Sequence, residues 1–473
     1  MTECKSPALH FHALGRRRVL AGFDGGAISS DAGALLLREL ELRTGIIRRF
    51  ADCFVDHRDP DLIEHTVYEL LLQRTGALAL GYEDLVDHDT LRHDPLLALL
   101  VGKADPTGAD RLRRRDKGMP LAGKSTLNRL ELTPPGADGQ SRYKKIVAEC
   151  SSIENVFVEI FLRAHPTPPE RITLDLDATD DPIHGGQLGR FFHGYYGHYC
   201  FLPLYIFCGE HLLCAKLRPS DIDASAGSID QLQRIVSFIR ARWPKVKITI
   251  RGDSGFCREH IMAWCEQAGV DFLLGLAKNR RLIGTIAEEL RQAEAQFGRT
   301  GAAARVFKDF DYQTLKSWSR ARRVIGKAEH LAAGRNPRFV VTSLSREDFK
   351  AATLYEKEYC ARGEMENRIK EQQLYLFADR TSAETMRANQ LRLWFSSMAY
   401  TLMVALRQHG LAGTDLHKAR CDTIRLKLFK IGGLIRVTVR RIVVSLSESY
   451  TCQKLFRQVM ENLRRLTPTR LQC

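Results

Sequence analysis

The sequence changes character at HPTPPE, residues 165–170, and this change constrains the fold more than any other feature. Before it, DLIEHTVYELLLQRT and YKKIVAECSSIENVFVEIFLRA carry apolar residues at the spacing of amphipathic helices. After it come three strand-like segments, ITLDLD, CFLPLYIF and HLLCAKL, and then helices alternating with the strands KVKITIRGD and DFLLGLA. Three strands followed by alternating helices and strands predict an α/β fold, in which a mixed sheet is covered by helices.

The same patterns divide the chain into five parts. A short strand is expected at residues 18–23, and Ser29, Ser30 or Asp31 could cap the helix that follows. Short β-like runs such as ARVFKDF and RFVVTSL indicate an insertion in the second half. The expected parts are a mainly helical DNA-binding region (1–168), a first core segment (169–282), a β-rich insertion (283–353), a second core segment (354–412) and a basic C-terminal region (413–473).

Charge and cysteine content restrict the class of protein. The chain has 71 Lys and Arg against 56 Asp and Glu, a net charge of +15, which favours a polyanionic partner such as nucleic acid over a merely basic protein. The 12 cysteines include no C-x-x-C pair, which argues against structural zinc and a disulfide scaffold. No apolar run reaches the ~18 residues of a membrane span, and the N-terminal basic cluster follows the apolar stretch, unlike a signal peptide. We expect a cytoplasmic protein without a membrane partner.

One short motif suggests nucleotide binding. Residues 118–125, GMPLAGKS, match the phosphate-loop pattern G-x-x-x-x-G-K-[ST]. A working loop of this kind joins a buried strand to a helix, but DRLRRRDK precedes this one, and Pro120 has no N–H to offer a phosphate. We therefore expect a loop that enters a helix, with Ser125 as a plausible cap, Lys124 as a candidate contact for a DNA phosphate, and no nucleotide cofactor.

Acidic residues end two of the expected strands. In ITLDLDATDD, Asp175 and Asp177 point to the same face because side chains alternate along a strand. In KVKITIRGDSGF, the strand ends at Asp253. If the two strands are neighbours, Asp177 and Asp253 converge at the edge where open sheets build their sites, and Mg²⁺ or Mn²⁺ between them would relieve the repulsion. The alternative for each residue alone is a carboxylate that caps a turn.

A third acid lies in the helical segment YCARGEMENRIKE. Tyr359, Arg362 and Glu366 are spaced i, i+3 and i+7, along one face of a helix. This face could add a metal ligand beside groups that hold a phosphate, although the segment alone is more typical of a solvated charged helix.

Together these segments resemble the DDE transposases of bacterial insertion sequences, in particular the group with a Tyr-x-x-Arg-x-x-x-Glu signature. Here the signature is formed by Tyr359, Arg362 and Glu366. The DATD segment is similar to the first acid of the family and indicates Asp177, and IRGDSGF is similar to the second and indicates Asp253. The resemblance covers nearly the whole chain, including a β-rich insertion between the second acid and the glutamate.

The resemblance implies an RNase H-like core and metal-dependent cut-and-paste transposition. Two ions, Mg²⁺ or Mn²⁺, would be held by the three acids while the element ends are cleaved and joined to target DNA. The family lysine seven residues after the glutamate is replaced by Gln373, and Lys370 is the nearest substitute. The tyrosine and arginine of the signature would hold the DNA backbone near a flipped base, and an insertion aromatic, for which Trp318 is the candidate, would stack on the base or pack the insertion's own core.

The implied partners are double-stranded DNA, as terminal inverted repeats and as target, and a second copy of the chain in the DNA complex. The implied location is the bacterial cytoplasm, in association with the nucleoid. The alternatives are a catalytically silent DNA-binding protein of transposase ancestry and a phosphate-loop NTPase. His193, His198 and Cys200 in FFHGYYGHYC lack a fourth metal ligand at the usual spacing, so we expect a turn with packed aromatic rings there.

Overall fold

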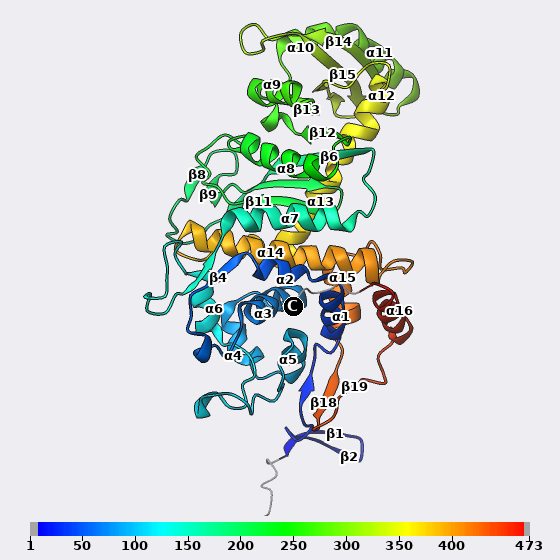
Figure 1. The fold of residues 1–473 in the computed structure, drawn as a ribbon. Coiled ribbons are helices and arrows are strands. Elements are labelled where there is room, and N and C mark those ends of the chain that lie inside the picture. Colours follow the sequence, from blue (N-terminus) through cyan, green and yellow to red (C-terminus); the bar gives the residue numbers. More distant parts are fainter. Residues whose placement is uncertain (1–7, 468–473) are drawn as a thin grey trace, which may run out of the picture. The chain divides into compact units, whose positions relative to one another are not determined.

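The computed structural model of the protein describes residues 8–467, so the first seven residues and the end of the expected basic region, 468–473, lie outside it. The chain forms two compact units (Figure 1). Unit 1 combines residues 1–149 with 398–473, and unit 2 consists of residues 150–397. The long helix α14 (Met386–Ala405) runs from unit 2 into unit 1.

Unit 1 is mainly helical. Its helix α3 begins with a capping box, in which Thr66 accepts the N–H of Glu69 at 3.2 Å and the Glu69 carboxylate accepts the N–H of Thr66 at 2.8 Å. Gly81 ends this helix in the left-handed conformation. The helices of unit 1 are α1 (Ala34–Thr44), α2 (Ile46–Ala51), α3 (Val67–Leu80), α4 (His88–Leu91), α5 (Pro95–Val101), α6 (Lys124–Glu131), α15 (Cys421–Ile424) and α16 (Gln453–Arg464).

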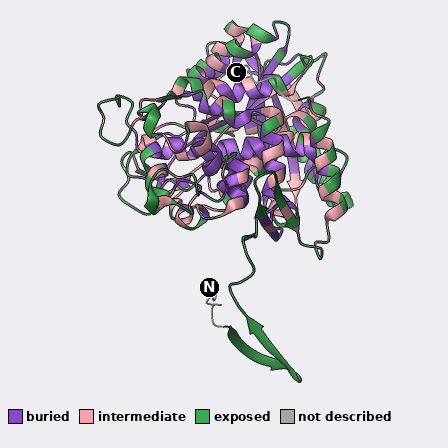
Figure 2. Cartoon of the chain, turned by 60° about the horizontal axis from the view of Figure 1, so that its bottom comes forward, coloured by how far each residue is buried: buried purple, intermediate pink, exposed green. Residues whose placement is uncertain are grey.

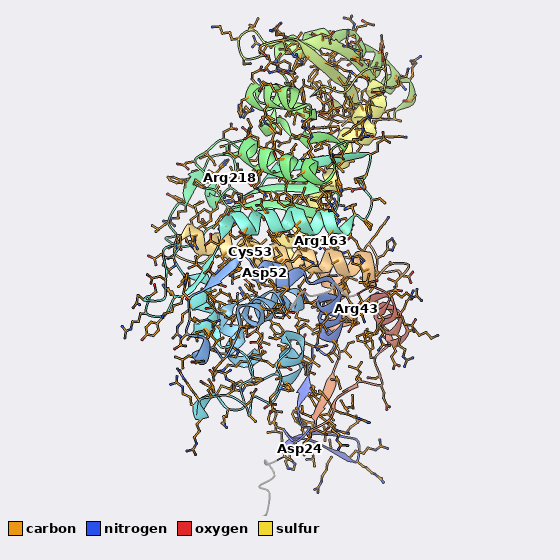
Figure 3. The ribbon with its side chains drawn as sticks, viewed as in Figure 1. Asp24, Arg43, Asp52, Cys53, Arg163 and Arg218 are labelled. Carbon is orange, nitrogen blue, oxygen red and sulfur yellow. The ribbon has the colours of Figure 1, made fainter. Side chains whose placement is uncertain are left out.

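The expected cap of α1 is wrong. Gly33 is the N-cap residue, without a side-chain cap. Ser29 and Asp31 are engaged elsewhere, because the Ser29 hydroxyl donates to Asp94 at 2.7 Å and Lys430 pairs with Asp31 at 2.6 Å. At the other end of the helix, Arg43 donates to the carbonyl of Leu466 at 2.9 Å, which ties α1 to the end of α16 (Figure 3).

Three small sheets complete unit 1. The strand expected at residues 18–23 is β2 (Arg17–Ala21), and it pairs with β1 (Leu9–Leu14), which the sequence patterns did not indicate. Figure 2 shows both strands exposed along their whole length. The other strands are β3 (Ile28–Ser29), β18 (Gly433–Val437) and β19 (Ile442–Leu446) in one sheet, and β4 (Phe54–Asp56) and β5 (Ile146–Ala148) in another.

Unit 2 is built on a nine-stranded mixed sheet with the order β11-β10-β6-β12-β13-β17-β15-β14, in which β16 pairs with β15. Strands β6, β12 and β13 are parallel to one another, and the pairs outside them are antiparallel. This confirms the predicted mixed sheet. Its strands are β6 (Arg171–Ala178), β10 (Leu204–Cys208), β11 (His211–Lys216), β12 (Lys247–Gly252), β13 (Asp271–Leu276), β14 (Ala304–Tyr312), β15 (Arg322–Leu331), β16 (Gly334–Arg335) and β17 (Arg338–Thr342).

The residues between 283 and 353 join this same sheet, where β17, β15 and β14 extend it beyond β13. They also include helical turns that the sequence patterns did not separate. The remaining helices of unit 2 are α7 (Cys150–Ala164), α8 (Ser228–Arg242), α9 (Glu259–Ala268), α10 (Arg280–Thr285), α11 (Ala287–Thr300), α12 (Ala351–Thr353) and α13 (Gly363–Leu376).

The segment CFLPLYIF, expected as one strand, forms two. Strand β9 (His198–Phe201) pairs with β7 (Asp181–Pro182) and β8 (Phe191–His193) in a small sheet, and β10 belongs to the large one. Pro203 separates them, and proline has no N–H to continue a ladder. The turn between His193 and His198 holds packed aromatic rings as expected, and the ring centroids of Tyr196 and His193 are 4.8 Å apart.

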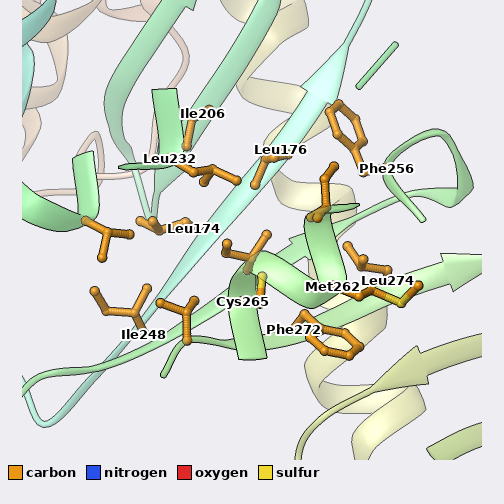
Figure 4. Packing of buried hydrophobic residues seen from close by; sticks show 14 of the residues in the cluster. Leu174, Leu176, Ile206, Leu232, Ile248, Phe256, Met262, Cys265, Phe272 and Leu274 are labelled. Carbon is orange, nitrogen blue, oxygen red and sulfur yellow. The ribbon is translucent and has the colours of Figure 1, made fainter. Parts of the chain in front are cut away.

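Side chains of the large sheet sort to two faces. Leu174, Leu176, Ile248 and Phe272 lie in one core with residues of α7, α8 and α9 (Figure 4). Leu273, the neighbour of Phe272, points instead into a second core with Leu354 and Tyr355, which precede α13. The segment that leads into α13 therefore packs on the opposite face of the sheet from α8 and α9.

Candidate active site

Two of the predicted acids stand at neighbouring strand ends. Strands β6 and β12 are parallel, and the last pair in their register joins Leu176 to Gly252. The next residue on each strand is Asp177 and Asp253, so the two carboxylates follow the register to the same edge of the sheet. The predicted convergence depends on this parallel pairing.

Burial and neighbouring charge act together on Asp177. Burial, together with the carboxylates of Asp253 and Glu366, raises the pKa of Asp177 to about 7, although Arg362 and the N–H of Ala178 oppose the shift. The three predicted acids thus lie within electrostatic reach of one another. A buried carboxylate beside two others is stabilised by a cation.

Asp253 also makes the turn that follows its strand. Its Oδ1 accepts the N–H of Gly255 at 2.8 Å, as the cap of a short 3₁₀ turn (Ser254–Phe256). The capping alternative raised for this residue is therefore also true of the structure. The second carboxylate oxygen of Asp253 has no hydrogen-bond partner among residues 8–467, which leaves it available to a ligand.

The third acid is carried by an irregular helix. Tyr359 ends a π-helical segment, η5 (Leu354–Tyr359), a 3₁₀ turn, η6 (Cys360–Arg362), follows, and Glu366 lies in the first turn of α13. The sequence predicted a regular α-helix over these residues, and this prediction is wrong. π-Helical turns occur frequently at functional sites.

Arg362 lies between two of the acids. Its Nη2 is 2.7 Å from Glu366 Oε1, and its Nη1 is 3.7 Å from Asp177 Oδ2. Burial lowers the pKa of Arg362, but the charges of Asp177, Tyr359, Glu366 and Asp253 outweigh this and raise it. The guanidinium is therefore held in its charged form among the carboxylates.

Tyr359 lies against the backbone of the Asp253 turn. A Cβ built on Gly275 of β13 would meet the Tyr359 hydroxyl at 2.5 Å and the Ser254 nitrogen at 3.0 Å. Only glycine leaves room for this contact. Burial raises the pKa of Tyr359, as does the charge of Asp253, so its hydroxyl stays protonated and can donate to a phosphate.

A buried ion pair beneath the acids was missed in the sequence. Arg251 Nε and Nη2 donate to the two oxygens of Asp175 at 2.5 and 2.7 Å, with both side chains more than nine-tenths buried. Arg251 also donates to the carbonyl of Glu358, next to Tyr359. One guanidinium therefore joins β6, β12 and the segment that carries the signature. The sequence did offer one sign of this role, because Arg251 lies two residues before Asp253 and therefore on the same face of the strand.

The donor set suits a hard cation, although the described residues form no preformed cage. Among residues 8–467 no group of three His, Cys, Asp or Glu side chains is close enough to hold a metal ion together. Asp177, Asp253 and Glu366 nevertheless offer only carboxylate oxygens, the ligands that Mg²⁺ and Mn²⁺ prefer. The positive group now among them is the Arg362 guanidinium.

The other predicted residues lie in different surroundings. Lys370 is exposed on α13, one turn after Glu366, without an ion-pair partner among the described residues. Gln373, at the position of the family lysine, donates to the Asp180 carbonyl and to Asp181 Oδ1, both at 3.1 Å. Trp318 is 7% exposed and packs edge-on against Tyr312, so in this conformation the ring belongs to the core and base stacking stays a prediction.

A helix begins at the end of the GMPLAGKS motif, but the element directly preceding the motif is not a strand. A 3₁₀ turn (Arg114–Asp116) precedes it, and α6 begins at Lys124 with Gly123 as its cap, so the expected cap at Ser125 is wrong. The Asp89 carboxylate accepts the N–H of Lys124 at 3.1 Å and pairs with its ammonium at 3.0 Å. A protein carboxylate thus holds the position where a phosphate loop would hold nucleotide phosphate.

Fold and site together define an α/β protein whose candidate active site is a group of three carboxylates at the ends of parallel strands and on a facing helix. Residues 11–468 match the family described as Transposase DDE domain group 1, and the chain belongs to this family. The predicted resemblance to DDE transposases is thereby confirmed at the level of the family, whose members generally use divalent metal ions to cleave and join DNA.

Other comparisons are more distant. A piggyBac transposase in a cryo-EM structure of its synaptic complex with hairpin DNA is similar with a TM-score of 0.38 and 10% identity, over 93% of this chain and 86% of that one. No curated protein sequence matches the chain. Within residues 8–467, no helix combines the length and apolar character that a membrane crossing requires.

Proposed function

We propose that this protein is the transposase of a bacterial insertion sequence, which moves by a cut-and-paste route. It would cleave DNA at the terminal inverted repeats and join the freed 3′ ends to target DNA, as a homodimer in the DNA complex and in the nucleoid-associated cytoplasm. The observation that carries the proposal is the parallel register of β6 and β12, with Asp177 and Asp253 next in line and Asp177 titrating under the influence of Asp253 and Glu366. The family assignment supports the reaction class.

The order and direction of strands β11-β10-β6-β12-β13 support an RNase H-like core. In this proposal the five parts expected from the sequence keep their roles, with the helical first part reading the element ends. Strands β14, β15 and β17 are then the β-rich insertion, attached through β13.

Asp177, Asp253 and Glu366 would hold two Mg²⁺ or Mn²⁺ ions, which when bound activate the attacking oxygen and stabilise the leaving one. The chain's own contribution is positioning. Arg362 balances the carboxylates in the absence of DNA and would turn its guanidinium to a phosphate oxygen when DNA enters. Tyr359 would donate its hydroxyl to the same backbone.

Three further residues complete the proposed DNA contacts. Lys370 is exposed on the same side of α13 as Glu366 and could pair with a phosphate. Lys124 lies at the start of α6 in unit 1. Trp318 could stack on a base only after leaving its contact with Tyr312.

The test is cleavage of a labelled duplex that carries the element end, with the wild type and Asp253→Asn in Mg²⁺. We expect cleavage by the wild type and a loss of several orders of magnitude in the variant. Asp271→Asn is the matched control, because Asp271 begins β13 at the opposite edge of the sheet and its bond from Ser343, 2.9 Å long, needs only an acceptor oxygen.

Each outcome separates the alternatives. Cleavage by Asp253→Asn at the wild-type rate contradicts the site. Binding of the duplex without cleavage by any variant favours the catalytically silent DNA-binding protein. ATP hydrolysis that disappears in Lys124→Ala would favour the phosphate-loop enzyme instead.

A further inference from the structure

A cavity of about 440 Å³ lies within unit 1, beside the first turn of α6. Seven Arg or Lys side chains line it, against three carboxylates. We call it the arginine cavity. The GMPLAGKS motif contributes Leu121, Gly123 and Ser125 to its wall, so the motif that first suggested phosphate binding borders a basic hollow.

All three carboxylates have cationic neighbours: Asp116 lies 3.9 Å from both Arg111 and Arg115, and the other two form closer pairs. Glu64 binds Arg111 through both oxygens, with Nη2 at 2.9 Å and Nε at 3.3 Å. Asp89 pairs with Lys124. These pairs fix the wall of the cavity and leave little negative charge to balance its other cations.

Several of the remaining arginines form no close ion pair, although the charge of Arg92 acts, after the bonds from Lys124, to lower the pKa of Asp89. Within residues 8–467, Arg92, Arg113 and Arg129 have no carboxylate within 4.0 Å. The Nε of Arg92 is moreover buried and has no hydrogen-bond acceptor within the described part of the chain. A buried charged donor without an acceptor is unfavourable, so an anionic oxygen at this place would stabilise the protein.

The cavity also offers groups that suit a phosphodiester. Arg129 lies over the ring of Tyr143, 5.0 Å from its centroid, and Arg142 lies 4.9 Å from the same ring. The side chains of Ser125 and Thr126 line the wall. Arginine guanidinium groups and hydroxyls are the donors most used for DNA phosphates.

The contacts of α6 argue against a free nucleotide as the ligand. Nucleoside triphosphates are bound through the first backbone N–H groups of a helix and a lysine ammonium. Here the Lys124 N–H and ammonium are both taken by Asp89, and the uncompensated charge lies on the arginines. Spread guanidinium groups suit a chain of singly charged phosphates better than one triphosphate.

We propose that the arginine cavity is a binding site for backbone phosphates of DNA, with Arg92 and Arg129 as its principal ligands. The inference rests on the proposed function, which supplies DNA as the polyanion, and it places a phosphate contact in unit 1, whereas the three candidate acids belong to unit 2. Because phosphate contacts carry no sequence information, this site fixes the position of the duplex rather than its sequence.

The experiment measures binding of a labelled 30-base-pair duplex to the full-length chain over a series of salt concentrations. The test variant is Arg92→Gln/Arg129→Gln, with Arg129→Gln alone as a milder change at an exposed position. The control is Arg242→Gln/Lys245→Gln, which removes the same charge from exposed residues beside the start of β12, at the sheet edge away from the acids.

For each phosphate that the variant no longer binds, we expect the slope of log K against log salt concentration to flatten by about 0.9. At ~0.1 M salt this change corresponds to about eightfold weaker binding of the duplex. The control should keep the wild-type slope. A wild-type slope in the double variant would overturn the proposal while leaving the proposed function intact, provided that the wild type binds and cleaves. Failure of the wild type to bind any duplex would contradict both the arginine-cavity proposal and the proposed function.

A second titration uses Mg²⁺ and ATP in place of DNA. Saturable ATP binding that disappears in the double variant would show that the cavity binds a nucleotide, and it would overturn the assignment to DNA.

Discussion

The Arg251–Asp175 pair offers the sharpest test of how the site is held together. Both side chains are more than nine-tenths buried, and the guanidinium binds the carboxylate through two nitrogens. Removing one partner leaves an uncompensated charge in the core, which costs about 3–5 kcal/mol. We expect Arg251→Met to lower the melting temperature of unit 2 by about 6–20 °C, at about 2–4 °C for each kcal/mol.

The double variant separates stability from activity. Arg251→Met/Asp175→Leu replaces both charges by apolar side chains of similar size, and such replacements are often neutral or stabilising. We expect most of the missing stability to return. DNA cleavage should stay low, because the Glu358 carbonyl, which Arg251 holds next to Tyr359, is then without its donor.

Calorimetry of the full-length chain, with DNA cleavage measured in parallel, gives both readouts. Arg291→Met is the control, since it removes an ion pair exposed on α11, and we expect it to leave the melting temperature unchanged. Additive losses in the double variant would refute the reasoning, because they would mean that the two side chains are not coupled in the folded protein. Full recovery of cleavage would refute the positioning role of Arg251.

Three further outcomes follow from single contacts. Gly275→Ala should lower cleavage and destabilise unit 2 by about 1–3 kcal/mol, because the new methyl group meets Tyr359 and the backbone of the Asp253 turn. Gln373→Leu should destabilise by about 1–3 kcal/mol in thermal unfolding, because it removes the donor to fully buried Asp181. Burial raises the pKa of Glu41 to about 7, above its value in the unfolded chain. The stabilisation from this carboxyl group is therefore complete below pH ~4.5, and about 3 kcal/mol of it is lost as pH rises through 7. Glu41→Gln should flatten this pH dependence in melting curves.

Each of these has a matched control. Gly284→Ala adds a methyl group where nothing lies within 4 Å, and it should leave cleavage unchanged. Gln296→Leu is the control for Gln373→Leu, because it makes the same substitution at an exposed position of α11. Glu461→Gln removes a surface carboxylate of unit 1 and should keep the pH dependence of the wild type. Equal effects in a variant and its control would mean that the named contact is not the cause.

The sequence predicted best what depends on neighbouring residues. Strands β6, β12 and β13 and the acids at the ends of β6 and β12 follow from local alternation, and the mixed sheet follows from the order of elements. The pairing of β6 with β12 was a condition of the argument, since parallel neighbours are far apart in the chain. The π-helical segment before Arg362 was missed because its residues fit a regular helix equally well.

Contacts between distant residues could not be predicted. Arg251 and Asp175 are 76 residues apart, and each looked like an ordinary strand residue. The arginine cavity is assembled from side chains between positions 58 and 146, so only the fold brings them together. A local motif such as GMPLAGKS names residue types at a fixed spacing, and whether its lysine is free depends on Asp89, 35 residues earlier.

The charges of the candidate active site support a role for an added cation. Asp175 has a full partner in Arg251, whereas Arg362 lies closer to Glu366 than to Asp177, at 2.7 against 3.7 Å. Arg362 therefore compensates Asp177 only at the longer distance, and burial together with the charges of Asp253 and Glu366 raises the pKa of Asp177. Arg362 cannot serve both acids at short range, so a divalent cation that bound Asp177 and its neighbours would release Arg362 from its carboxylates. The freed guanidinium would then be available to a DNA phosphate, which links metal binding and DNA binding through one side chain.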